Sequence, residues 1–295
     1  MSQGLDFGYR RLLVELALSA SDPETLRSVA QFARLLGLEL HGLFIEDEAL
    51  LALADLPFAR EIRLPTHEWG PMDAGRLEHE LQQQANLVRR RLEAAVQALG
   101  MTHGFEVLRG DPGACLAERS CATDIIVIAP ADAAGTRSLR TSAQVHEAAY
   151  HADAATLLLP PRPHRQRGAV VVVLADPADP NLETAARIAV AGEERLLVLV
   201  PAVTETAAVI ARTTASGLSG QRITVRSLAG LQPEDVMAAL GGEHERLIVM
   251  TGGAEPAGGI DAASRIVALR HSAVLMVPPR GRPRLATARE ADEQS

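Results

Sequence analysis

The stretch DIIVI at residues 124–128 decides the fold, and it returns as RLIVM at residues 246–250. Both are almost unbroken apolar runs, and each is followed by turn residues, at 129–130 and 251–253. Such runs are typical of strands buried on both faces, as in a parallel sheet that helices cover. Ligands of open α/β sheets usually bind at the loops after such strands, so these two loops are the first candidates for a functional site.

The composition indicates a globular protein that handles neither nucleic acid nor membrane. The chain has 295 residues, which is enough for two domains. Its net charge of −8 argues against a basic nucleic-acid-binding face and weakly against binding to anionic membranes. No apolar run approaches the roughly 18 residues of a membrane span. Cys115 and Cys121 are the only cysteines, so we expect no disulfide framework and a cytoplasmic location.

Strands and helices alternate along the whole chain. The expected strands are residues 11–18, 38–45, 105–108, 124–128, 155–159, 169–174, 196–200, 221–228, 247–250 and 273–277. The expected helices are residues 25–36, 76–99, a short one that Asp111 caps and that ends near Cys121, 142–151, 182–190, 204–215, 233–240 and 262–269. Repeated strand–helix–strand units close right-handed into parallel sheets.

Three landmarks recur in the same order in both halves of the chain. They are a Gly/Pro turn, the buried apolar strand, and a last strand that ends in Pro-Pro. We therefore predict an α/β fold of two tandem domains, each a five-stranded parallel sheet flanked by helices. The domains are expected at residues 1–163 and 164–280, followed by a disordered tail at 281–295. The first domain carries an insertion at 46–99, which we expect to be irregular over 46–75.

This repeat resembles the tandem form of the universal stress protein family. The resemblance covers residues 9–161 and, more loosely, 168–279, and its most telling stretches are 12–42 and 122–160. It implies a Rossmann-like fold of the adenine nucleotide alpha hydrolase type. Members of the family commonly pair through their last strand, and many bind ATP. The resemblance therefore implies a homodimer and raises the question of a nucleotide site.

The first half departs from the family's nucleotide motif. Nucleotide-binding members have an acidic residue at the end of the first strand and Gly-x-x-Gly, then Gly-Ser/Thr, after the fourth. Glycines let the backbone approach phosphate, and free N–H groups bind its charge. Here these positions fall on Ala17, Ala129, Asp132 and Ser142. Since Pro130 lacks an N–H and Asp132 would repel phosphate, we predict no ATP binding in the family manner in this half.

The second half keeps part of the motif. The candidate ligand-binding residues are Asp176, Thr251, Gly252, Gly253, Gly258 and Ser264. Their spacing differs from that of the family, and Glu255 and Asp261 add negative charge. Two interpretations stay open. The Gly-rich segment is either a plain loop or a residual nucleotide or anion site.

No residue set predicts a catalytic or metal site. Cys115 and Cys121 are six positions apart on a short helix, which places them on different faces, so we expect buried free thiols rather than metal ligands. The histidines lack the spacing of a helical metal pair, and no nucleophile elbow or Walker-type loop is present.

The loop 56–72 in the insertion contains Phe58, Ile62, Trp69 and Met72. Two interpretations of these apolar residues stay open. They form an apolar patch for a partner, or they pack over the sheet of their own domain.

The leading functional hypothesis is a non-enzymatic, cytoplasmic module of the stress response or of signalling. It would have a degenerate nucleotide site and no cofactor, and would act as a homodimer or by binding a protein partner. One alternative is an ATP or adenine-nucleotide sensor, with or without slow hydrolysis, that uses the second-half candidates. Another is a small-molecule or lipid binder that uses the 46–99 insertion.

Overall fold

The protein is described by a computed structural model. The described residues are 8–16, 23–63, 68–128, 145, 147–149, 152–160, 165, 167–175, 179–201, 222–252 and 259–279. The expected helix at 204–215, most of the one at 142–151 and the tail at 281–295 lie outside these residues.

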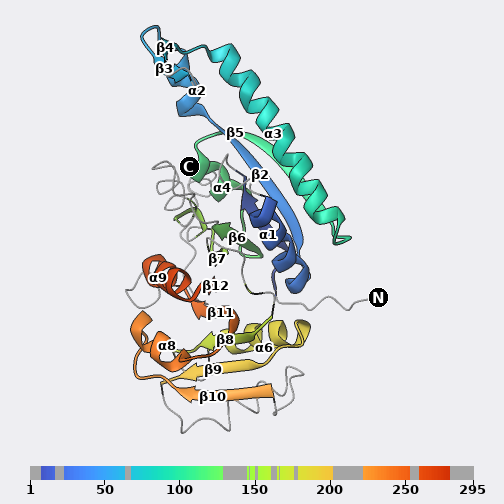
Figure 1. Ribbon diagram of the computed structural model, residues 1–295, viewed down its shortest axis with the longest axis vertical. Coiled ribbons are helices and arrows are strands. Elements are labelled where there is room, and N and C mark those ends of the chain that lie inside the picture. The colour runs from blue at the N-terminus through green and yellow to red at the C-terminus, as the bar shows by residue number, and fades with distance from the viewer. Residues whose placement is uncertain are drawn as a thin grey trace, which may run out of the picture.

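Each half of the chain forms five parallel strands, as the sequence predicts. The first half contributes β1 (Arg11–Glu15), β2 (Glu39–Asp47), β5 (His103–Gly110), β6 (Asp124–Ile128) and β7 (Ala155–Leu158). The second contributes β8 (Ala169–Val173), β9 (Leu196–Val200), β10 (Ile223–Ser227), β11 (Glu245–Thr251) and β12 (Ala273–Val277). The spatial orders are β7-β6-β1-β2-β5 and β12-β11-β8-β9-β10, so both halves have the same topology (Figure 1).

The two halves share one continuous ten-stranded sheet, which differs from the two separate sheets expected. Their last strands, β7 and β12, pair antiparallel, with Leu157 opposite Leu275 and Thr156 opposite Met276. Each of these strands also has a parallel neighbour on its other side, β6 for β7 and β11 for β12. The last-strand edges through which family members commonly pair are therefore both occupied within this one chain.

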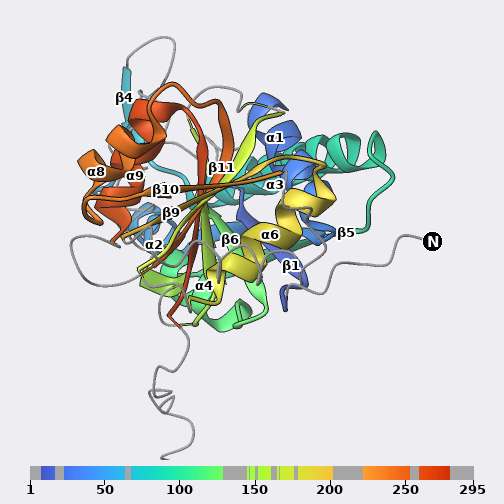
Figure 2. The ribbon, with the colours of Figure 1, turned by 90° about the horizontal axis from the view of Figure 1, so that it is seen from below.

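Helices cover both faces of the sheet (Figure 2). The described helices are α1 (Pro23–Leu36), α2 (Glu48–Ala54), α3 (Ala74–Gln97), α4 (Pro112–Arg119), α6 (Asn181–Ala191), α8 (Pro233–Leu240) and α9 (Ile260–Arg270). One face packs against α1, α3 and α6 in a single core that runs through both halves. The other face packs against α8 and α9 in the second half and against α4 in the first. This division follows from the alternation of side chains along each strand.

The prediction of an irregular segment at 46–75 is wrong. It contains the end of β2, the helix α2 and an antiparallel pair, β3 (Arg60–Arg63) and β4 (Glu68–Pro71). Asp47 starts α2 by accepting the backbone N–H of Ala49 at 2.9 Å. Leu51 of α2 packs with Leu81 of α3 in a small core of its own. The two strands are only four residues long, and prolines occur in the sequence before, between and at the end of them, so no periodic pattern indicates them.

Candidate functional site

The topology places a candidate ligand site at the carboxyl ends of two strands in each half. Both halves start at a central strand, add strands to one side, and then return to the other side. The crevice therefore lies between β1 and β6 in the first half and between β8 and β11 in the second, where this class of sheet usually binds ligands.

In the second half three polar side chains meet in this crevice. Asp179 and Asn181, at the start of α6, are 7% and 2% exposed, and Thr251 is at the end of β11. The Thr251 hydroxyl donates to Asp179 Oδ2 at 2.9 Å, and Asn181 Nδ2 donates to Thr251 Oγ1 at 2.8 Å. The backbone N–H of Asn181 donates to Asp179 Oδ1 at 2.9 Å. These hydrogen bonds tie the start of α6 to the end of β11.

The network uses groups that would otherwise bind a phosphate. The first helical N–H of α6, on Asn181, already has the Asp179 carboxylate as its acceptor. A carboxylate at a helix N-terminus occupies the place where an anion is stabilised. The N–H of Gly252 donates to the carbonyl oxygen of Val277 at 2.7 Å. Among the described residues of the crevice, these donors are satisfied within the protein, and the Asp179 carboxylate would repel an anion.

The structure brings together only part of the predicted second-half site. Thr251 and Gly252 are at the crevice, whereas Ser264 is exposed on α9, in the second turn of that helix. Asp176, Gly253 and Gly258 lie outside the described residues.

Sequence reasoning missed Asp179 and Asn181. The segment ADPADPN at 175–181 contains two Asp-Pro pairs, and the first, at Asp176, was predicted to be the acidic position. The second pair is followed at once by the polar Asn181, which is a signal that a helix starts there.

The first half offers a different acidic group. Glu15 is the last residue of β1, in register with Leu43 of β2 and one position beyond the Val14–Val127 pair. Burial raises the pKa of the Glu15 carboxyl to about 7. Within the described chain its side chain has no hydrogen bond or salt bridge. The motif residues expected here, Ala17, Ala129, Pro130, Asp132 and Ser142, lie outside the described residues.

At the opposite end of the sheet, each half has a buried acid at the start of its fourth strand. Asp124 is fully buried and receives Arg11 Nε at 3.0 Å and Nη2 at 2.8 Å. Glu245 is also fully buried and receives Arg270 Nε at 2.8 Å and Nη2 at 2.7 Å, with the Ser272 hydroxyl at 3.0 Å. These paired groups connect strands and helices away from the crevices, so we assign them to stability.

The cysteines differ from the buried pair expected. Cys115 is partly buried, and burial raises its pKa, whereas Cys121 is exposed. The Cys121 thiol is 3.3 Å from Asp124 Oδ2. Both thiols are free, and no group of three or more His, Cys, Asp or Glu in the described part of the chain is arranged to hold a metal ion.

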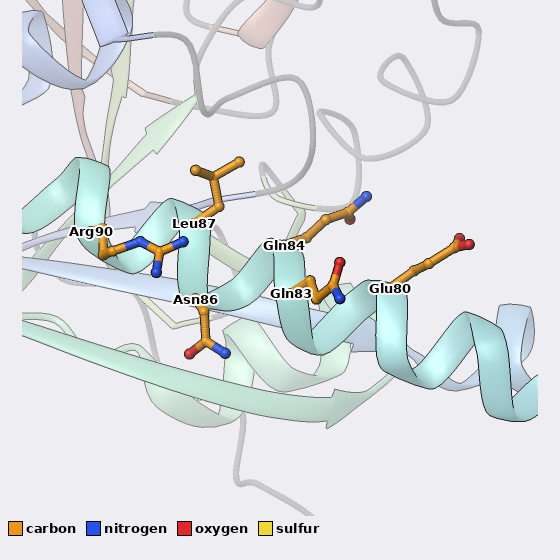
Figure 3. A pocket seen from close by; sticks show the side chains of 6 residues that line it. All are labelled: Glu80, Gln83, Gln84, Asn86, Leu87 and Arg90. Carbon is orange, nitrogen blue, oxygen red and sulfur yellow. The ribbon is translucent and has the colours of Figure 1, made fainter.

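The insertion has a groove of about 520 Å³ along α3 (Figure 3). It is lined by Glu80, Gln83, Gln84, Asn86, Leu87 and Arg90. Gln84 Oε1 is buried there, and none of the described residues donates a hydrogen bond to it. The groove is open to solvent, and its known wall consists of side chains from one helix.

Comparisons with known proteins identify the fold. No protein-family model and no curated protein matches this sequence. A universal stress protein structure from Archaeoglobus fulgidus DSM 4304 has 16% identity and a TM-score of 0.62, and the match covers 92% of this chain and 98% of that one.

Two structures from Pseudomonas aeruginosa also match. The functionally unknown protein PA1789 from strain PAO1 has 14% identity and a TM-score of 0.51, and the match covers 92% of this chain and 93% of that one. A putative universal stress protein from strain UCBPP-PA14 has 14% identity and a TM-score of 0.52, with 92% and 94% covered. The chain therefore has the universal stress protein fold, and the matches extend over both halves of its sheet. Among the described residues, no helix has the length and apolarity needed to cross a bilayer.

Proposed function

We propose that the protein is a non-catalytic module of the stress response or of signalling, located in the cytoplasm, with two domains at residues 1–163 and 164–280. In this proposal neither crevice binds ATP in the manner of nucleotide-binding universal stress proteins. The protein then acts by association, with a second copy of itself or with another protein.

The observation that carries this proposal is the hydrogen-bonded network in the second-half crevice. The N–H groups of Asn181 and Gly252 and the hydroxyl of Thr251 already donate to acceptors of the protein itself. A phosphate group would have to displace the Asp179 carboxylate from the start of α6. Breaking hydrogen bonds to a buried charged group costs about 1.5–3 kcal/mol each, which opposes nucleotide binding.

An ATP titration followed by isothermal calorimetry, with and without Mg²⁺, tests the proposal. We expect no heat of binding up to about 1 mM ATP, the weak end of useful affinity. Micromolar binding would contradict the proposal, and its loss in Gly253→Leu would assign the site to the Gly-rich loop. Thr224→Val, a change at an exposed position of β10, is the control for that variant.

The second candidate function is an adenine-nucleotide sensor in the second half, with or without slow hydrolysis. It is favoured by the position of Thr251 and Gly252, at the end of β11 and beside the start of α6. This candidate needs the Asp179 network to open when the nucleotide binds. Nucleotide-dependent protection of the Asn181 amide from hydrogen exchange would support it, and an unchanged exchange rate would not.

A third candidate is a small-molecule or lipid binder that uses the 46–99 insertion. The open groove on α3 favours it, because Gln84 Oε1 has no donor there and a ligand with an N–H or O–H group would supply one. Native mass spectrometry of the purified full chain tests this candidate. A co-purifying small molecule that is lost in Gln84→Leu and kept in Gln82→Leu, a change at an exposed position of α3 outside the groove, would support it.

A further inference from the structure

The β3–β4 ribbon turns its apolar face outward. Alternate residues of a strand point to opposite faces, and the pairs Arg60–Pro71 and Ile62–Trp69 share one face. The N–H of Met72 donates to the carbonyl of Ala59 at 3.0 Å, which extends the ribbon and places Phe58 on the face of Ile62. All members of this outer face are exposed: Phe58, Arg60, Ile62, Trp69 and Pro71.

The inner face of the ribbon carries mostly small or polar residues and lies against α3. Gly70 is buried, and Ala59 and Met72 are partly buried. Glu61 forms an ion pair with Arg76 of α3. A ribbon on a protein surface normally turns its apolar residues toward the core, so this arrangement is reversed. The reversal indicates that another surface covers the outer face.

The exposed apolar residues of the described chain are concentrated here. Phe58 is 76% exposed, Trp69 61% and Ile62 49%, and Leu53 and Leu56 beside them are 46% and 41% exposed. These five, which we name the ribbon patch, are among only eight large apolar side chains that are exposed in the described residues. They present roughly 500 Å² of apolar side-chain surface, a size typical of interaction sites. In Figure 1 the ribbon lies at the end of the molecule far from β10.

We propose that the ribbon patch joins two copies of this chain about a two-fold axis through the Ile62–Trp69 pair. This axis places the Arg60–Pro71 end of one ribbon over the Arg63–Glu68 end of the other. Strand alternation places Glu68 on the inner face, so Arg60 is the one charged residue among the described members of the outer face. The two-fold arrangement places Phe58, Ile62 and Trp69 of one copy against the same side chains of its partner, so the patch is self-complementary through its apolar side chains.

The size of the surface fits a dimer. A standard interface buries about 800 Å² on each partner, and the ribbon patch together with Arg60, Pro71 and their backbone approaches this value. Trp69, at its centre, belongs to a residue type that often dominates binding energy. The last-strand edges are already used inside the chain, so a homodimer needs a surface of this kind. This proposal rests on the proposed function in one respect. It names a second copy of the chain as the partner in the association proposed there.

Sedimentation velocity of the full chain from about 1 to 100 µM tests the proposal, in the affinity range of moderate interfaces. We expect a concentration-dependent dimer whose Kd rises at least ~10-fold in Trp69→Ser. The matched control is Leu269→Ser on α9, which changes a side chain of the same 61% exposure outside the patch and should leave Kd unchanged. A wild-type monomer at every concentration, or a dimer that Trp69→Ser does not weaken, overturns the proposal.

Cross-linking gives a second measurement that does not depend on affinity. In a Cys115→Ser, Cys121→Ser background, Ile62→Cys lies next to the proposed axis and should form a disulfide-linked dimer under mild oxidation. Leu269→Cys should remain monomeric in the same background. Equal cross-linking of both variants, or of neither, contradicts the two-fold arrangement. An ATP titration of Trp69→Ser distinguishes the dimer proposal from the proposed absence of ATP binding. Loss of the dimer should leave the heat of ATP binding the same as in the wild type.

Discussion

The two halves of the sheet share one strand order, but each secures the amino end of its fourth strand differently. In the first half Asp124 pairs with Arg11 of the neighbouring strand β1, and the Arg11 side chain is 33% exposed. In the second half Glu245 pairs with Arg270 at the end of α9, which is only 15% exposed. The buried acid thus recurs at the same place, whereas its basic partner comes from a strand in one half and from a helix in the other.

The two halves differ more at the carboxyl ends of their strands, where the crevices lie. In the second half the acidic group of the crevice, Asp179, receives hydrogen bonds from Thr251 and from the Asn181 backbone. In the first half Glu15 has no such partner in the described chain, and burial raises its pKa. A repeated backbone therefore does not repeat the chemistry of its crevices. Variants of corresponding groups in the two halves measure this difference.

The largest effect is expected at Glu245. Arg270→Ala leaves a fully buried carboxylate without its bidentate partner, and such a loss costs about 3–5 kcal/mol in free energy of unfolding. Arg11→Ala should cost less, about 2 kcal/mol, because Asp124 keeps the Cys121 N–H at 3.0 Å and the Arg11 side chain is more exposed than that of Arg270. Urea denaturation followed by circular dichroism measures both.

Arg265→Ala is the control for these two variants. Arg265 pairs with Glu234 on the surface, where both side chains are 62% exposed, so the expected change is within about 0.5 kcal/mol. If Arg270→Ala destabilised the protein no more than Arg265→Ala, the buried pair would not stabilise the second half, and the contrast between the halves would disappear.

The next effect is a pH dependence specific to the first half. The unfolded chain releases the Glu15 proton near pH 4.5 and the folded chain near pH 7, so this group lowers stability as pH rises between these values. Glu15→Gln removes the ionisation. Between pH 4.5 and pH 8 the free energy of unfolding of the variant should therefore rise by about 3 kcal/mol relative to that of the wild type.

Thermal and urea unfolding at pH 4.5, 6 and 8 measure this difference. Glu39→Gln, at a partly buried position on the neighbouring strand β2, is the matched control. If the difference in free energy of unfolding between wild type and Glu15→Gln stays constant with pH, Glu15 is not buried as a neutral acid. The first crevice would then resemble the second more closely.

A smaller effect is expected at Thr251. Thr251→Val keeps the shape of the side chain but removes the donor to Asp179 and the acceptor for Asn181, which should cost about 2 kcal/mol. Thr224→Val, at an exposed position of β10, should stay within about 0.5 kcal/mol. Equal stability of the two variants would mean that the network does not connect α6 to β11.

The regular part of the fold could be predicted from the sequence because its signals are local. The strand at 124–128 was predicted with its observed bounds, since a run of β-branched and apolar residues indicates a strand buried on both faces. Asp111 was predicted to cap a helix, and it accepts the Ala114 N–H at 2.8 Å at the start of α4. Each signal depends only on neighbouring residues.

The remaining features depend on contacts between distant parts of the chain. An apolar strand such as β7 shows that both its faces are buried, but not that its edge pairs with β12. Thr251 and Asp179 meet only because β8 and β11 are neighbours in the sheet. The β3–β4 ribbon was missed because its four-residue strands are too short to show a periodic pattern, and their pairing depends on contacts between the two strands.

The smallest effect compares helix starts that correspond in the two halves. In α4 the Asp111 carboxylate accepts the Ala114 N–H at 2.8 Å, so Asp111→Ala should cost about 1 kcal/mol. In α8 the contact runs the other way, because Asp235 accepts the Gln232 N–H at a longer 3.3 Å, and Asp235→Ala should cost about half as much. Urea midpoints of the two variants against wild type give both values. A larger loss in Asp235→Ala than in Asp111→Ala would reverse the comparison, and would place the stronger helix start in the second half.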